Sequence, residues 1–196
     1  MADIKIEDIK KLKELSGAGL TDAKTALVEA EGDFDKALEA MRKKGLTKAE
    51  KRGDRETREG LVDSYVHDGR IAAIVEVNCE TSFVAKTDEF KALAHQIAMQ
   101  VASMNPMYVA EADIPEDVMI DKKAELAAEF KGPADKKDMI LEGQVKKAFA
   151  EKILLNQPYI LDDSKTVEGF IKDAIAKTGE NITVRQFRRI ELGVTE

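Results

Sequence analysis

Residues 61–79 read LVDSYVHDGRIAAIVEVNC, a stretch that contains two extended segments joined by a tight turn. Asp68-Gly69 is a dipeptide that accepts the positive φ angles of a two-residue hairpin turn. Residues 71–75 are apolar at every position, which is typical of a strand that is covered on both faces. The stretch therefore predicts a β-hairpin, with a first strand over 61–67 and a second, covered strand over 70–79.

Helical patterns follow this hairpin, and one further strand pattern ends the chain. Apolar residues at helical spacing predict helices over about 87–105, 115–130, 135–155 and 166–177. Alternating residues over 182–192 predict the final strand. This order predicts an α+β core domain, residues 61–196, in which helices cover a small antiparallel sheet. Three strands are few for such a sheet, so we expect a second copy to complete it and predict a homodimer.

The segment before the hairpin contains three short helical patterns separated by glycine. The first stops at residues 16–19, the second ends at Gly32, and Asp33 caps a third that is predicted to stop at Gly45. Three brief helices with one apolar face each can bury those faces only against one another, so residues 1–45 predict a compact three-helix bundle. Residues 46–60 have no apolar period, and we interpret them as a charged linker that is either a tether or an exposed, charge-paired helix.

Composition limits the partners that this chain can have. Its formal net charge is -7, and such an acidic chain is a poor match to a phosphate backbone, so no direct nucleic-acid binding is expected. The single cysteine, Cys79, cannot form an internal disulfide, and no secretory start or spanning apolar stretch is found in the sequence. We therefore expect a cytoplasmic protein that has no membrane partner.

Sequence motifs for covalent chemistry are mostly missing. There is no glycine-rich phosphate loop of the Lys-Ser or Lys-Thr type and no paired-cysteine spacing for a metal. His67 and His95 are predicted to be solvated surface residues, and Cys79 is predicted to be a small core residue rather than a nucleophile. We expect no catalytic residues, no metal site and no cofactor.

A basic group near the end of the chain could be interpreted as a phosphate site. It consists of Arg185, Arg188 and Arg189 on the last predicted strand. Because the domain is acidic, we favour the interpretation that these side chains cover the outer face of the strand and pair with the acidic helices.

The most informative segment for function follows the hairpin directly. Residues 81–86 read TSFVAK, which places an aromatic and a branched apolar residue where a polar connection is expected. Phe83 therefore either folds back onto the core or projects outward as an anchor for a partner.

Two stretches of the sequence match a known family. Residues 12–24, LKELSGAGLTDAK, and residues 76–86, EVNCETSFVAK, resemble the two signatures of translation elongation factor Ts. The likeness continues through residues 104–106, 157–159 and 179–182 to the last strand, so it covers nearly the whole chain. The resemblance implies a first domain similar to ubiquitin-associated (UBA) domains, followed by a core domain.

The resemblance also implies a function and a partner. The family acts as the nucleotide exchange factor of elongation factor Tu, a GTPase, and uses no covalent chemistry. Long members of the family carry the core module twice, and this chain resembles the short form that carries it once. This implies a homodimer whose two cores replace the duplicated one, and a complex that contains two copies of each protein.

The family implies two sets of partner-binding residues. By analogy Thr81, Ser82, Phe83 and Val84 lie against the nucleotide domain of the GTPase, where Phe83 acts as a wedge that disturbs the magnesium and phosphate contacts. Lys13, Leu20 and Thr21 match positions where the N-terminal bundle touches the GTPase. The family usually has Asp where this chain has Ser82, and a hydroxyl offers only a neutral hydrogen bond, so we predict slower exchange than in a relative that carries the carboxylate.

Two other functions are compatible with the residues alone. The chain could be a binding adaptor, in which the bundle recognises ubiquitin-like or nascent-chain partners and the second domain only dimerises. It could also be an enzyme that uses His67 and nearby carboxylates. A GDP release assay with elongation factor Tu discriminates all three functions.

Overall fold

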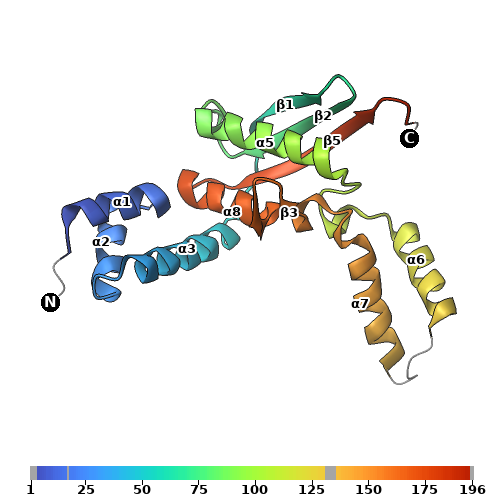
Figure 1. Cartoon of the computed structure of the whole chain (residues 1–196), viewed down its shortest axis with the longest axis horizontal. Helices are drawn as coiled ribbons and strands as arrows, with labels where there is room; N and C mark the ends of the chain where they lie inside the picture. Colours follow the sequence, from blue (N-terminus) through green and yellow to red (C-terminus); the bar gives the residue numbers. More distant parts are fainter. Residues whose placement is uncertain (1–3, 17, 131–135, 195–196) are drawn as a thin grey trace. The chain divides into compact units, whose positions relative to one another are not determined.

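The computed structural model describes residues 4–16, 18–130 and 136–194, and it has the predicted α+β architecture (Figure 1). It divides into two compact units, which are described separately. The first comprises the residues up to 63 together with 76–96 and 169–185, and the second comprises 64–75, 97–168 and the residues from 186 onward. The division into a bundle, a linker and a core domain, made from the sequence, stays a prediction.

The N-terminal bundle consists of α1 (Ile6–Ser16), α2 (Leu20–Glu29) and α3 (Phe34–Glu50). The amide of Lys36 donates a 3.1 Å hydrogen bond to Asp33 Oδ1, which confirms the predicted cap of α3. The three apolar faces meet in one cluster of buried side chains, as the sequence pattern requires. Its members are Ile9, Leu12, Ala23, Ala26, Leu27, Ala37 and Met41.

The prediction that the third helix stops at Gly45 is wrong, because α3 continues to Glu50. Gly45 faces Ala176 of α8 (Val167–Thr178), and a Cβ added at Gly45 would lie 3.2 Å from the Ala176 methyl carbon. Ala49, one turn further on, is buried. Close packing on α8 therefore favours helix through a glycine that local propensity alone treats as a stop.

The main sheet has the strand order β1-β2-β5, formed by β1 (Glu59–His67), β2 (Ile71–Cys79) and β5 (Ile182–Glu191). Asp68 and Gly69 have φ angles of 48° and 65°, which confirms the predicted turn. The prediction that β2 is covered on both faces is wrong. Burial alternates in the middle of this strand, with Val75 buried and Ile74 47% exposed, and only residues 77–79 at its end are all buried.

The four helices predicted after the hairpin are present as α5 (Asp88–Met104), α6 (Glu116–Glu129), α7 (Lys137–Ala150) and α8. The predicted end of the third near residue 155 is wrong, because α7 ends at Ala150 and a short turn, η3 (Leu154–Asn156), follows. The short helix α4 (Ser82–Ala85) was not predicted, and a further turn is η1 (Glu111–Asp113). Figure 1 shows α6 and α7 side by side as a hairpin of two helices. The predicted start of the latter helix at residue 135 lies outside the described residues.

A buried amide pair in the second unit holds α5 to the segment after α7. Gln100 donates to Gln157 Oε1 and to the carbonyl of Pro158, both at 3.1 Å, and the Ile160 amide donates to Gln100 Oε1 at 2.9 Å. Gln157 in turn donates to the carbonyl of Glu151 at 2.8 Å. This segment continues into the small sheet of β3 (Pro158–Tyr159) and β4 (Asp162–Thr166). Because both amides are paired, their burial does not leave unsatisfied polar groups.

Candidate partner-binding site

The segment after β2 is a single helical turn and not the loop that the sequence suggested. Thr81 has extended backbone angles and caps α4, because the Val84 amide donates to Thr81 Oγ1 at 3.4 Å. Thr87 then links α4 to α5: its hydroxyl donates to the Val84 carbonyl at 2.8 Å and accepts from the Phe90 amide at 3.2 Å. Two threonine side chains thus define where the short helix starts and where the next one begins.

Phe83 projects from α4 into solvent and is 80% exposed. The next residue, Val84, is 6% exposed, so one of these two side chains faces solvent and the other is buried. Ser82 is also exposed, whereas Ala85 is buried. In the free chain Val84 therefore attaches the turn to the core, and Phe83 is the apolar side chain that is available to a partner.

Glu180, in the connection between α8 and β5, holds the start of α4. Thr81 donates two hydrogen bonds to its carboxylate, one from the backbone amide at 3.0 Å and one from Oγ1 at 2.6 Å. Bonds to an ionised acceptor are stronger than neutral ones, and two of them restrict rotation as well as distance. The N-terminal residue of the candidate site is therefore attached to a segment 99 residues away in the sequence.

Asn181 and Glu80, the neighbours of Glu180 and Thr81 in the sequence, form a second link between the same two segments. The backbone amide of Asn181 donates to Glu80 Oε1 at 2.6 Å, and the buried side chain of Asn181 donates to the carbonyls of Gly53 and Arg55 at 3.1 and 2.7 Å. Arg55 also contacts the Glu80 carboxylate at 3.4 Å. The end of β2, the start of β5 and residues 53–55 are thus joined in one polar network.

The residues predicted to bind a partner through the bundle lie on different elements from α4. Lys13 is in the last turn of α1, and Leu20 and Thr21 open α2. All three side chains are exposed, on either side of the turn between the two helices. The structure thus groups Ser82, Phe83 and Val84 on one short helix that Thr81 caps, and the other three residues lie on the bundle.

Comparison with known proteins identifies the family. The family described as Elongation factor TS matches residues 3–194. This chain belongs to the elongation factor Ts family. It is 49% identical over 193 residues to elongation factor Ts of Thermotoga neapolitana, covering 97% of this chain and 98% of that protein. Elongation factor Ts of Moorella thermoacetica is 48% identical, with 95% and 94% covered.

A longer relative of the family matches in the same way. Elongation factor Ts of Rippkaea orientalis is 48% identical over 198 residues, which cover 98% of this chain and 80% of that protein. Membership of the family supports a role in translation elongation.

Cys79, His67 and His95 were considered from the sequence as possible reactive groups, and the structure shows the surroundings of each. Burial raises the pKa of the Cys79 thiol above its usual 9.0, the Glu180 carboxylate raises it further, and Sγ donates to the Thr81 carbonyl at 3.2 Å. His67 and His95 are about half exposed, and His95 Nδ1 lies 3.2 Å from Asp63 Oδ2. A buried, protonated thiol is a poor nucleophile.

The three arginines of β5 bond to groups of the sheet rather than to helix carboxylates as predicted, and Arg189 also reaches a helix backbone, because its Nε donates to the carbonyl of Ala102 in α5 at 3.1 Å. Arg185 lies 3.4 Å from Glu76 on β2, and Arg189 lies 2.7 Å from Glu191 on its own strand. Arg188 donates to the carbonyl of Phe187 at 2.7 Å. The carboxylates that face this strand are therefore supplied by the sheet itself.

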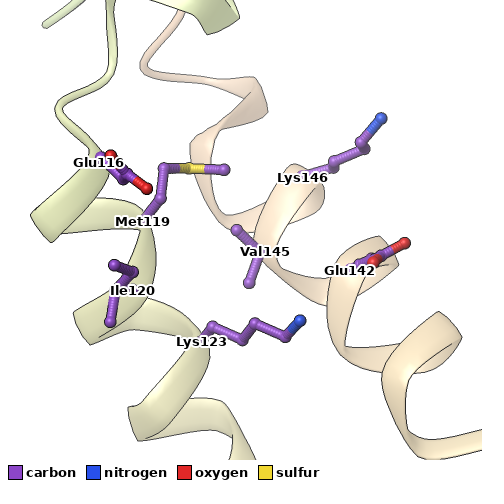
Figure 2. Close-up of a pocket in the computed structure, with 7 residues that line it drawn as sticks. All are labelled: Glu116, Met119, Ile120, Lys123, Glu142, Val145 and Lys146. Carbon is purple, nitrogen blue, oxygen red and sulfur yellow. The ribbon is translucent and has the colours of Figure 1, made fainter.

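A cavity of about 240 Å³ lies between α6 and α7, and none of the predicted site residues lines it (Figure 2). Met119 and Val145 lie between the two helices, and charged side chains surround them. Within the described ranges, no cluster of three or more His, Cys, Asp or Glu residues could hold a metal ion. A search of the same residues finds no helix that is long and apolar enough to span a membrane.

Sequence reasoning missed Glu180 and Asn181 as parts of the site. Residues 179–182 were among the stretches that resemble the family, but nothing in their pattern indicates that they contact residues 80 and 81. A carboxylate after a helix is usually a solvated residue, and its role follows here only from the pairing across 99 residues.

Proposed function

We propose that this chain is the guanine nucleotide exchange factor of elongation factor Tu and acts in the cytoplasm. It binds the GDP-bound GTPase and promotes GDP release by disturbing the magnesium and phosphate site, after which GTP binds. The exposed Phe83 on a capped, anchored helical turn is the observation that carries this proposal. An isolated exposed aromatic ring on a fixed support is typical of an interface anchor.

The thermodynamics of exchange require no covalent step. A partner that binds the empty GTPase more tightly than the GDP-bound form must weaken GDP binding by the same factor, because the two binding equilibria are linked. Phe83 supplies apolar surface that can be buried only in the complex. In our proposal, the nucleotide-free state of the GTPase offers the pocket that accepts this ring.

The N-terminal bundle supplies a second contact in this proposal. Leu20 is an exposed apolar residue at the start of α2, beside Thr21, and Lys13 adds a cation at the end of α1. Two separate contacts on one partner raise the total affinity, because the second forms within an existing complex. The bundle then adds affinity for the GTPase, while Phe83 disturbs the magnesium and phosphate site.

We also propose that the chain is a homodimer, which would give a complex of two exchange factors and two GTPases. The main sheet has three strands, and each contributes an exposed β-branched residue within the second unit: Val66, Ile74 and Ile190. Apolar side chains on an uncovered sheet face favour association.

Light scattering tests the dimer. It should give twice the mass of one chain, and Ile74→Asp should lower the measured mass. Ile120→Asp, on exposed α6, is the control, and a monomeric wild type would contradict the dimer.

Release of fluorescent GDP from elongation factor Tu tests the exchange function. We expect the wild-type chain to accelerate release, and we expect Phe83→Ala to lower this acceleration roughly tenfold or more, the effect of truncating an aromatic anchor. Leu161→Ala is a matched control, because Leu161 is another exposed apolar residue on a separate element. No acceleration by the wild type, or full activity of Phe83→Ala, would refute the proposal.

A further inference from the structure

The support of α4 indicates a role for a residue that is not expected to touch the partner. We infer that Glu180 is a positioning residue for Phe83: its carboxylate fixes Thr81, and through Thr81 it fixes the direction in which α4 presents the aromatic ring. This inference rests on the exchange function proposed above. It concerns how the free chain is prepared for binding.

The length of α4 explains why such a support is needed. A helix of four residues, Ser82–Ala85, is far too short to be stable from its own hydrogen bonds. Its conformation must come from contacts outside it, and at its N-terminal end these are the two bonds from Thr81 to Glu180. Without the carboxylate, the Thr81 amide and hydroxyl lose the acceptor that orients them.

Glu180 is itself held in place by its neighbours. Gly179 adopts φ +78°, a conformation that favours glycine, and the Glu180 amide donates to Thr178 Oγ1 at 3.3 Å. Asn181 is 2% exposed and is bonded to Glu80, Gly53 and Arg55. The carboxylate therefore projects from a rigid segment, which is what a positioning group requires.

A positioning role has a distinct kinetic signature. If α4 loses its support, Phe83 samples several orientations in the free chain, and the partner must restore one of them on binding. The apparent affinity then falls with the fraction of free chains in which Phe83 already has the orientation that binds. The assembled complex itself is unchanged. Removal of Glu180 should therefore raise the half-saturating concentration and preserve the maximal release rate. Removal of Phe83 itself should lower the maximal rate.

The first measurement reports the mobility of position 83 in the free chain. The sequence contains no tryptophan, so Phe83→Trp creates a single indole reporter at the exposed position, which can be excited selectively over the tyrosines. We expect the emission anisotropy of this reporter to fall when Glu180→Ala is added, because the indole then moves independently of the core. Glu129→Ala, which removes an exposed glutamate at the end of α6, is the control and should leave the anisotropy unchanged.

The second measurement is GDP release from elongation factor Tu at increasing concentrations of full-length chains that keep Phe83. Glu180→Ala should raise the half-saturating concentration roughly 3- to 10-fold, as expected for the loss of partly solvated bonds to a charged acceptor. Thr81→Ala removes only the Oγ1 bond to Glu180 and also the Oγ1 cap of α4, so the loss in the double variant should be smaller than the sum of the two single losses, because the Oγ1 bond is broken in both. Glu180→Gln replaces Glu180→Ala if circular dichroism shows that the alanine variant is unfolded.

The outcomes separate this inference from the proposed function. If the wild type does not accelerate GDP release, the exchange function fails. If the wild type is active but Glu180→Ala matches it in anisotropy or in half-saturating concentration, the positioning role is overturned and exchange stands. Additive losses in the double variant, or a reduced maximal rate without increased mobility, would also overturn it.

Discussion

Gly60 of β1 lies directly against the carbonyl of Val77 on β2. A Cβ added at Gly60 would be 2.2 Å from the Val77 oxygen and 2.8 Å from the α-carbon of Asn78. The backbone of Gly60 also has φ +154°, which side-chain-bearing residues rarely adopt. Close approach of the two strands at this point therefore requires glycine, just before β2 leads into the candidate site.

Gly60→Ala should lower the free energy of unfolding by about 2–4 kcal/mol, because the methyl group meets backbone atoms that cannot move aside. Denaturant titration should show an earlier midpoint with an unchanged slope. Gly69→Ala is a useful control: it also has a positive φ, but nothing lies within 4 Å of its added Cβ. Equal effects of the two substitutions would argue against the steric explanation.

Gly143→Ala should stabilise the chain. Gly143 lies inside α7, and an added Cβ would meet nothing within 4 Å. Alanine loses less backbone entropy than glycine when a helix forms, so we expect a gain of about 0.5–1 kcal/mol. Thermal unfolding followed by circular dichroism measures it. A lower transition temperature than that of the wild type would contradict this expectation.

Ser82→Asp should accelerate GDP release from elongation factor Tu. Ser82 opens α4 and is exposed beside Phe83, where the family resemblance implies a carboxylate. A carboxylate there can attract a basic group of the GTPase away from its nucleotide-binding arrangement, whereas a hydroxyl cannot. Ala124→Asp, which adds the same charge on α6, controls for net charge. An unchanged release rate for Ser82→Asp would count against this electrostatic contribution.

The Cys79 thiol should be slow to react in the folded chain. Because burial raises its pKa above the usual 9.0, the reactive thiolate fraction at pH 8 is smaller than in the unfolded chain. Alkylation by iodoacetamide, followed by mass spectrometry, should be roughly tenfold or more slower than in guanidinium, and it should accelerate with pH.

The same shift has a consequence for stability. The raised pKa of Cys79 adds to the free energy of unfolding. This contribution is fully present below the pKa of the unfolded thiol, and it is lost as pH rises through the higher pKa of the folded chain. Equal rates of alkylation for the folded and unfolded chains would show that the thiol is accessible and ionised normally.

The N-terminal bundle and the hairpin could be predicted because their signals are local. Asp33 and Thr87 cap helices through amides three residues away, and Asp68-Gly69 adopts the positive φ angles that its turn needs. Such features depend on neighbours in the sequence. The end of α3 could not be predicted in this way, because packing of Gly45 on Ala176 overrides the local stop signal.

The sequence by itself determined the longer helices, the hairpin and the family, because periodicity, capping and signature residues are properties of nearby positions. It also restricted Phe83 to two roles, as a core residue or an anchor. Only the tertiary structure excluded the core role, by burying Val84 and exposing Phe83 beside Thr81, which is bonded to Glu180, and the anchor role is what we propose from it. A four-residue helix has too few internal bonds to specify its own conformation, so its geometry is set by a residue 99 positions away.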